Sequence, residues 1–321
     1  MRIGKVGLFI LCFSLVLSSC KKDDGGDDII AVELRDRAEQ EIADQIVLED
    51  YLTSHYYNSE ELSNLANASI TDIVITALAE GETDPPDGHT ILKVDTEIKD
   101  VEFADTAYKV HILRLRQGNG NESPTFADNV RLLYEGFLED GTIFDSSSTP
   151  VLFDLTQLIP GWRKVIPEFN IAESFVEQGD GTVNYVNGGL GIMFVPSGLA
   201  YFSNATGGIP SYTPIMFKFE VLQMFENDHD GDGIPSYLED LKDENGQTDG
   251  EFIVNFQDRT DEFDDDTDGD TTPNYFDPDD DNDGIPTINE DLDGDGNYDE
   301  HDTNGNGIPN YLDTEDQEIG E

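Results

Sequence analysis

The chain has 321 residues and a formal net charge of −53 at pH 7. Residues 227–321 carry 34 Asp and Glu against two basic residues, which argues against nucleic acid as a partner because phosphate binding needs clustered lysine and arginine. The only cysteines, Cys12 and Cys20, lie near the N-terminus, so no disulfide framework or cysteine-based zinc site is expected beyond them. The length suggests two to three units.

Residues 1–19 have the pattern of a secretory signal peptide. Arg2 and Lys5 precede an apolar run that is too short to span a bilayer. The run ends in Leu-Ser-Ser-Cys20, which resembles the bacterial lipobox and implies cleavage before Cys20 and lipidation of that residue. An ordinary signal peptide is the alternative. Residues 20–30 are charged and glycine-bearing, and are expected to form a flexible tether.

The lipobox resemblance implies a location and a partner. A lipidated Cys20 would anchor the chain to a membrane in the cell envelope, outside the cytoplasm. Lys21 after the cysteine resembles outer-membrane sorting, and the acidic run that follows resembles surface-export signals. The outer membrane and the cell surface therefore both stay open as locations.

Residues 31–105 are expected to form a helical or mixed region without a chemical motif. Residues 31–53 contain few helix breakers and carry apolar side chains mostly four positions apart, which predicts an amphipathic helix. These apolar positions are Leu34, Ala38, Ile42, Ile46 and Leu52. The further elements expected up to residue 115 are a helical or mixed segment at 59–79, a loop at 81–88, and strands at 91–94 and 108–115.

Residues 106–226 are expected to form an α+β domain. Many short strands and one central helix predict an antiparallel sheet wrapped on that helix. The expected elements are a strand at 128–134, a strand, turn and return strand at 134–144, a short strand at 153–155, a helix within 163–175 and broken near Pro167, and apolar strands at 190–195 and 215–225.

Several ordered blocks of this region resemble one family. They are Tyr-x-Gly-x-Leu-x-Asp-Gly-x-x-Phe-Asp-Ser-Ser at 134–147, Phe-x-Leu at 153–155, Leu-Ile-Pro-Gly-Trp at 158–162, Pro-x-x-Leu-Ala-Tyr at 196–201 and Ile-Pro at 209–210. Residues 107–226 are thereby similar to an FKBP-type peptidyl-prolyl isomerase domain. The resemblance implies a five- or six-stranded antiparallel sheet curled around a short helix.

The resemblance also implies an aromatic pocket, with Trp162 as its floor and Asp145 and Tyr201 as polar groups at its rim. The Ile159 N–H is implied as a donor to the substrate carbonyl. Rotation about an X–Pro bond faces a barrier of about 20 kcal/mol, and a dry aromatic cage favours the twisted amide over the planar one. No cofactor is required. The implied site residues are Tyr134, Phe144, Asp145, Leu158, Ile159, Trp162, Tyr201, Ile209 and Phe217.

Three features depart from the family's pattern. Val151 stands where the family often has an aromatic residue, and Phe202 stands where it usually has glycine. The segment between Trp162 and Ile192 is longer than in the smallest members. These departures are expected to reshape the rim of the pocket.

The C-terminal segment, residues 227–321, contains an internal repeat. Acidic or amide side chains occupy positions 1, 3, 5 and 12 of five registers, and Gly233, Gly284, Gly296 and Gly307 occupy position 6 of four of them. This pattern predicts loops that bind structural Ca²⁺, which prefers six to eight oxygen ligands. The registers are Asp228, Asp230, Asp232 and Glu239; Asp266, Asp268, Asp270 and Asp277; Asp279, Asp281, Asp283 and Glu290; Asp291, Asp293, Asp295 and Asp302; Asp302, Asn304, Asn306 and Asp313.

Proline at position 8 separates these loops from EF-hands. Pro235, Pro273, Pro286 and Pro309 have no N–H for the short strand pairing that EF-hand loops make there. The segment instead resembles thrombospondin type 3 calcium repeats without their cysteines. A disordered acidic spacer is the alternative.

Three functions follow as hypotheses. The first is an envelope lipoprotein that isomerises X–Pro bonds in exported proteins and assists their folding. The second is a non-catalytic lipoprotein that binds proline-containing peptides in the same pocket. The third is a structural or adhesion lipoprotein stiffened by calcium.

Overall fold

The computed structural model describes residues 34–242, 247–252 and 265–315. The expected signal peptide, the tether and Cys20 lie outside the described residues. The described residues from Arg35 onward belong to one compact unit. Within the described residues no helix combines the length and the apolar character needed to cross a membrane.

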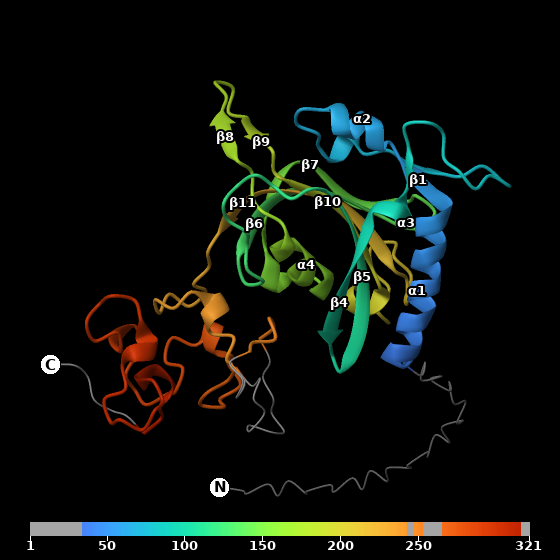
Figure 1. Ribbon diagram of the computed structural model, residues 1–321. Helices are drawn as coiled ribbons and strands as arrows, with labels where there is room; N and C mark the ends of the chain where they lie inside the picture. Colours follow the sequence, from blue (N-terminus) through green and yellow to red (C-terminus); the bar gives the residue numbers. More distant parts are fainter. Residues whose placement is uncertain (1–33, 243–246, 253–264, 316–321) are drawn as a thin grey trace, which may run out of the picture. The chain divides into compact units, whose positions relative to one another are not determined.

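A six-stranded antiparallel sheet forms the centre of the fold (Figure 1). The strand order is β4-β5-β10-β11-β6-β7. The fold is therefore α+β, and the expected antiparallel sheet is confirmed. The strands are β4 (Thr96–Phe103), β5 (Thr106–Arg116), β6 (Asn129–Phe137), β7 (Ile143–Asp154), β10 (Gly189–Val195) and β11 (Ile215–Phe225).

The sheet is covered on both faces. Strand β10 is buried at every position, because its alternate side chains enter two different cores. Met193 and Val195 pack with the short helix α4 (Pro160–Val165), while Ile192 and Phe194 pack with the long helix α1 (Arg37–Ser54). The sheet thereby holds α4, which carries Trp162, against one face.

The smaller elements complete the unit. A second sheet has the order β2-β1-β3, and β8 and β9 form a separate hairpin. These elements are β1 (His55–Tyr57), α2 (Ser59–Asn64), η1 (Ile70–Asp72), β2 (Ile75–Ala77), β3 (Thr90–Ile91), α3 (Leu92–Asp95), η2 (Leu155–Gln157), η3 (Ile166–Glu168), β8 (Ser174–Glu177), β9 (Val183–Val186) and η4 (Ser197–Leu199).

Three boundaries differ from the sequence expectation. The helix expected within 163–175 begins at Pro160, because proline suits the first turn, where its missing N–H has no helical partner. The separate strand expected at 153–155 is the end of the long strand β7. The strand expected at 91–94 turns at Leu92 into the short helix α3.

Of the five apolar positions expected to define the inner face of this helix, only Leu52 is buried in α1. Leu34, which lies before the helix, and Ile42 and Ile46 are exposed, and so is Ala38. The buried positions are Gln40, Glu41, Asp44, Leu48, Tyr51 and Leu52. Polar residues can be buried here because they find partners, so the apolar spacing identified the helix but not its inner face.

Asp44 is the clearest of these buried polar groups. Its carboxylate accepts hydrogen bonds from the Ser197 N–H at 2.7 Å and the Ser197 hydroxyl at 2.6 Å. The Gln40 amide donates to the same carboxylate at 2.7 Å. Burial raises the pKa of Asp44, while these three donors oppose the rise. Helix α1 is thus tied to η4, which leads to Tyr201.

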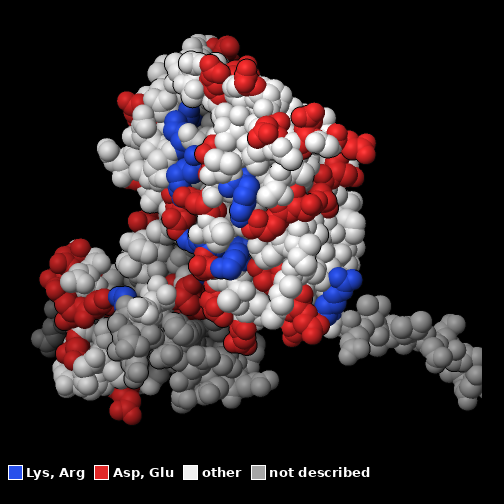
Figure 2. Space-filling view, turned by 45° about the vertical axis from the view of Figure 1, so that its right-hand side comes forward, with Lys and Arg blue, Asp and Glu red and all other residues white. Residues whose placement is uncertain are grey.

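The described part of the acidic C-terminal segment consists of loops and short 3₁₀ turns. Its small core contains Ile234, Tyr298 and Tyr311. On the face seen in Figure 2, most of the lysine and arginine lie in a broken band, with aspartate and glutamate between and beside them. The turns are η5 (Ser236–Leu238), η6 (Asn274–Phe276), η7 (Thr287–Asn289), η8 (Tyr298–Glu300) and η9 (Asn310–Leu312).

Candidate active site and metal centres

A largely apolar cavity of about 340 Å³ opens beside α4. The structure brings all nine residues of the predicted pocket together around it, although they come from four separate parts of the sequence. Four further lining residues were not predicted: Phe153, Gln157, Thr206 and Gly207. Phe153 lies two positions after Val151 in β7. Because every second side chain of a strand points to the same side, strand periodicity would have placed Phe153 and Val151 on one face of the sheet.

Trp162 forms the floor of this cavity and is only 4% exposed. Its ring lies 4.8 Å from that of Phe217, and 6.1 Å from that of Tyr134 in an edge-to-face arrangement. The backbone N–H of Trp162 donates to the Ile159 carbonyl at 3.0 Å, which fixes the first turn of α4. Aromatic rings packed in these geometries form a rigid apolar surface.

Gly136 allows two pocket rings to approach the sheet. A Cβ atom at this position would lie 2.6 Å from the Phe144 ring and 2.7 Å from the Phe217 ring. Those two rings meet edge to face at 5.4 Å. In the Tyr-x-Gly motif, Tyr134 therefore lines the cavity. Gly136, two residues later, leaves room for the rings of Phe144 and Phe217.

The polar groups of the cavity are few. The Tyr134 hydroxyl donates to Asp145 Oδ2 at 2.8 Å. Burial, and then the hydrogen bond to Asp145, raises the pKa of Tyr134 to about 12. Burial, with a contribution from the Asp145 charge, also raises the pKa of Tyr201. Both phenols are therefore neutral hydrogen-bond donors at ordinary pH.

The Ile159 N–H is also free to donate. Ile159 precedes the first turn of α4, and among the described residues its N–H has no hydrogen-bond partner. Its side chain lines the cavity. An apolar cavity with a few hydrogen-bond donors suits an apolar peptide segment with a carbonyl to be oriented.

The effect of the three departures on the rim of the pocket stays a prediction. Val151, Phe202 and the long segment after Trp162 do not line the cavity. That segment forms the β8–β9 hairpin instead, which projects from the rest of the unit in Figure 1. Phe202 adopts a φ of +48°, in the left-handed region where glycine is favoured, and packs its ring against Tyr212 and the Arg37 guanidinium.

The fold and cavity together define a small α+β domain that presents an aromatic pocket. Residues 120–222 match the family model described as FKBP-type peptidyl-prolyl cis-trans isomerase. The segment is therefore similar to that family over less than half of the chain. Residues 229–290 match a second family model, described as BamM C-terminal.

Relatives match the chain over the same part. An FKBP-type peptidyl-prolyl cis-trans isomerase FkpA of Aeromonas hydrophila is 28% identical over 148 residues, which are 45% of this chain and 48% of the relative. The macrophage infectivity potentiator of Trypanosoma cruzi is 30% identical over 115 residues, 35% of this chain and 50% of the relative. The chain thus spans about half the length of the curated relatives it matches.

Two further proteins are similar to part of the chain. FK506-binding protein 3 of Dictyostelium discoideum is 36% identical over 104 residues, 32% of this chain and 48% of the relative. The crystal structure of FkpA from Escherichia coli is 28% identical and superposes with a TM-score of 0.30, covering 36% of this chain and 47% of that one.

The acidic loops share a backbone pattern. The carboxylate at position 1 accepts N–H groups from within its own loop, as Asp228 does from Gly231 and Gly233. Asp291 and Asp302 each accept three such N–H groups. Glycine at position 6 has a positive φ, between +84° and +103°, in four of the loops. These turns hold the carboxylates in fixed positions.

A buried polar residue at position 9 closes each proline-containing loop. Its side chain accepts a hydrogen bond from the backbone N–H of position 2. Its own backbone N–H donates to the carbonyl of the residue before the loop, a bond that the preceding proline cannot make because it has no N–H. These residues are Ser236, Asn274, Thr287 and Asn310. The sequence analysis missed them, although a small polar residue follows proline in all four registers.

The structure gathers the predicted cation ligands only in part. Asp266, Asp268 and Asp270 cluster, as do Asp279, Asp281 and Asp283. The first register differs, because Asp230, Asp232 and Glu239 cluster with Asp280, which was not predicted. In the fifth register the Asn304 and Asn306 amides donate to Asp313. Asp228, Asp277, Glu290, Asp302 and Asp313 fall outside the clusters.

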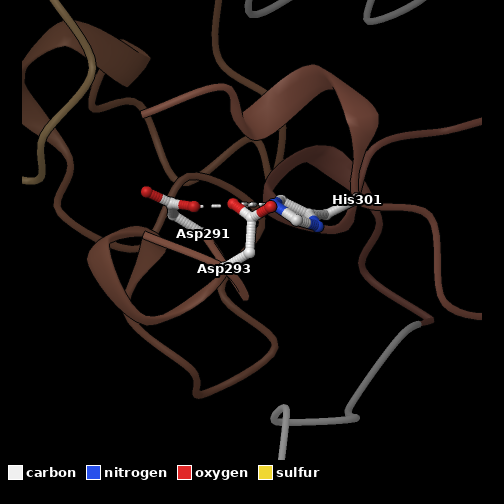
Figure 3. A group of neighbouring side chains, drawn as sticks. All are labelled: Asp291, Asp293 and His301. Carbon is white, nitrogen blue, oxygen red and sulfur yellow. Dashed lines mark ion pairs between the residues drawn. The ribbon is translucent and has the colours of Figure 1, made fainter. Parts of the chain in front are cut away.

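The fourth register is rearranged by a histidine. His301 Nε2 lies 3.5 Å from Asp291 and 3.8 Å from Asp293, and Figure 3 shows its ring pointing toward both carboxylates. Asp295 groups separately with Asp293 and Glu300. The predicted set of Asp291, Asp293, Asp295 and Asp302 is therefore not brought together as one site.

Proposed function

We propose that this chain is a peptidyl-prolyl cis-trans isomerase that assists the folding of exported proteins in the cell envelope. Its substrates would be proline-containing segments of those proteins. The observation that carries the proposal is the convergence of nine residues, from four parts of the sequence, on one aromatic cavity above Trp162. The match of residues 120–222 to the isomerase family model supports it.

The mechanism would need no covalent chemistry. The twisted amide has lost the resonance that makes an X–Pro bond planar, so its carbonyl carries less charge separation. An apolar floor of Trp162 and Phe217 is compatible with that state. The Ile159 N–H would orient the carbonyl that precedes proline. Tyr134 would hold Asp145 at the rim, because its hydroxyl donates to that carboxylate.

Isomerisation of a model X–Pro peptide by the full chain tests this proposal. We expect Asp145→Val and Trp162→Ala to lower kcat/KM at least about tenfold, which corresponds to about 1.4 kcal/mol. Phe175→Ala is the control, because Phe175 is an exposed aromatic residue in β8 outside the cavity. Peptide binding without acceleration by the unaltered chain would instead favour the non-catalytic binder.

The acidic segment favours a second function beside catalysis. We propose that its loops bind structural Ca²⁺ through side chains of the five registers. Clusters of carboxylates whose ligand atoms lie within 4.8 Å of one another support this. Nearby carboxylates repel one another, and a cation would relieve that repulsion. Ca²⁺ should then increase the protease resistance of residues 227–321, and an unchanged digestion pattern would contradict calcium binding.

The leader completes the proposal. We infer that Cys20 is lipidated and anchors the chain to a membrane, on the outer membrane or at the cell surface. Support comes from the Leu-Ser-Ser-Cys sequence that ends the apolar run. Mass spectrometry of the chain expressed in a bacterial host tests the inference. A diacylglycerol adduct on Cys20 is expected, and Cys20→Ser should release the chain from the membrane fraction.

A further inference from the structure

Four carboxylates from two different loops converge in the acidic segment. Asp230, Asp232 and Glu239 belong to the first loop, and Asp280 belongs to the third. One ligand atom from each lies within 4.8 Å of all the others. Glu239 and Asp280 are 1% and 2% exposed. They are 41 positions apart in the sequence, so this cluster joins distant parts of the chain.

The carboxylates of this cluster lack partners. Among the described residues, both oxygens of Glu239 and both oxygens of Asp280 accept no hydrogen bond, and neither do Oδ2 of Asp230 and Oδ2 of Asp232. No lysine, arginine or histidine of the described residues forms an ion pair with any of the four. Buried carboxylates without donors or counter-charges are costly unless a cation or a proton neutralises them.

The direction of Asp280 follows from the loop's backbone. Asp280 occupies position 2 of its register, and its N–H donates to the Thr287 hydroxyl at 3.3 Å. Its neighbours Asp279 and Asp281 group with Asp283 in the third loop's own cluster. Asp280 does not join them but reaches the first loop. At the equivalent position, His229 also points out of its loop, and its Nε2 lies 3.2 Å from Asp154.

From this geometry we propose that Asp230, Asp232, Glu239 and Asp280 bind one divalent cation that joins the first and third loops. The six unpartnered oxygens supply the hard ligands that Ca²⁺ prefers, and four carboxylates give a strongly negative site. This inference rests on the proposed binding of calcium by the acidic segment. It assigns a ligand, Asp280, that the twelve-residue repeat does not contain.

Calcium binding to the full chain, measured by calorimetry in detergent with Ca²⁺ alone as the probe, tests the shared site. We expect Asp280→Asn to bind one ion fewer than the unaltered chain. Glu226→Gln is the control, because this exposed glutamate precedes the first loop and lies outside the cluster. If Asp280→Asn binds as many ions as the control, the first loop binds its ion without Asp280, and the inference is overturned.

A double variant separates the remaining outcomes. If Glu239 and Asp280 share one ion, Glu239→Gln, Asp280→Asn and the double variant will each lack the same single ion. Loss of two ions in the double variant would show separate sites and overturn the inference. If the unaltered chain binds no calcium, the proposed calcium function is wrong. If the unaltered chain binds calcium and Asp280→Asn binds the same number of ions, only the shared site is wrong.

Discussion

Glu251 lies 2.7 Å from Arg163, the residue that follows Trp162 in α4. The same carboxylate lies 3.0 Å from Lys164, whose ammonium also donates to the carbonyls of Asp249 and Gly250. The acidic segment is thus bound directly to the helix that carries the floor of the cavity. Both cations and the carboxylate are largely buried, so the contact is better shielded from solvent than a surface ion pair.

We predict that Glu251→Gln destabilises the unit by about 1–3 kcal/mol, because two partly buried cations lose their counter-charge. Trp162 is the only tryptophan, so its fluorescence during urea unfolding reports on α4 directly. Asp100→Asn is the control. It removes an exposed pair with Lys109 and should destabilise the unit much less, because solvent screens such a pair. Equal effects of the two substitutions would show that the Glu251 contact is no stronger than a surface pair.

A second prediction concerns Gly136. In Gly136→Ala the new methyl group would meet the Phe144 and Phe217 rings at 2.6 Å and 2.7 Å, so at least one ring must move. We expect a several-fold loss of isomerase activity and a shift in the Trp162 emission. Gly179→Ala is the control, because no atom lies within 4 Å of a Cβ built at Gly179. Unchanged activity in Gly136→Ala would show that the ring positions do not limit catalysis.

Nine of the thirteen residues that line the pocket could be predicted because they stand in ordered blocks of the sequence. Trp162, Asp145 and Tyr201 could each be identified from neighbours within a few positions, and the antiparallel sheet brings those blocks together. Phe153 was missed because it was assigned only to a short strand. Phe153 instead belongs to the long strand β7, and its side chain lines the cavity.

Buried polar side chains account for two features that the sequence did not predict, the inner face of α1 and the position of Asp280. The apolar spacing of residues 34–46 gave a helix, but the inner face of α1 is set by Gln40, Glu41 and Asp44, which have partners far away in the sequence. Asp280 was missed for a similar reason. A twelve-residue repeat describes ligands within one loop and contains no information about contacts between loops.

A third prediction concerns pH. His111 is fully buried in β5, with Nε2 2.8 Å from Gln45 Oε1 and 3.7 Å from Glu49. Burial lowers its pKa from 6.5 to about 4, helped by the nearby charges of Lys93 and Lys109 and opposed by Glu49. Between pH 4 and pH 6.5 His111 is protonated in the unfolded chain but mostly neutral in the folded one. The contribution of neutral His111 to the free energy of unfolding is therefore complete above pH 6.5 and is lost as the pH falls toward 4.

Urea unfolding between pH 4.5 and 7 checks this prediction. One proton corresponds to about 1.4 kcal/mol per pH unit, so His111→Gln should have a pH slope shallower by up to that amount. Comparison with the unaltered chain removes the contribution of the carboxylates, which titrate in both proteins. Identical slopes would mean that His111 is protonated equally in the folded and unfolded chains.

The last prediction concerns Thr287, the buried residue at position 9 of the third loop. Its hydroxyl accepts the N–H of Asp280 at 3.3 Å, and its N–H donates to the Pro278 carbonyl at 3.1 Å. Thr287→Val keeps the shape but leaves the Asp280 N–H without its partner, which costs about 1–3 kcal/mol when the group stays buried. Because Asp280 is oriented by this bond, calcium binding to the shared site should weaken, whereas Thr287→Ser should retain it. Calcium titrations of the three proteins measure the effect, and equal affinities would show that the side chain at position 9 does not orient Asp280.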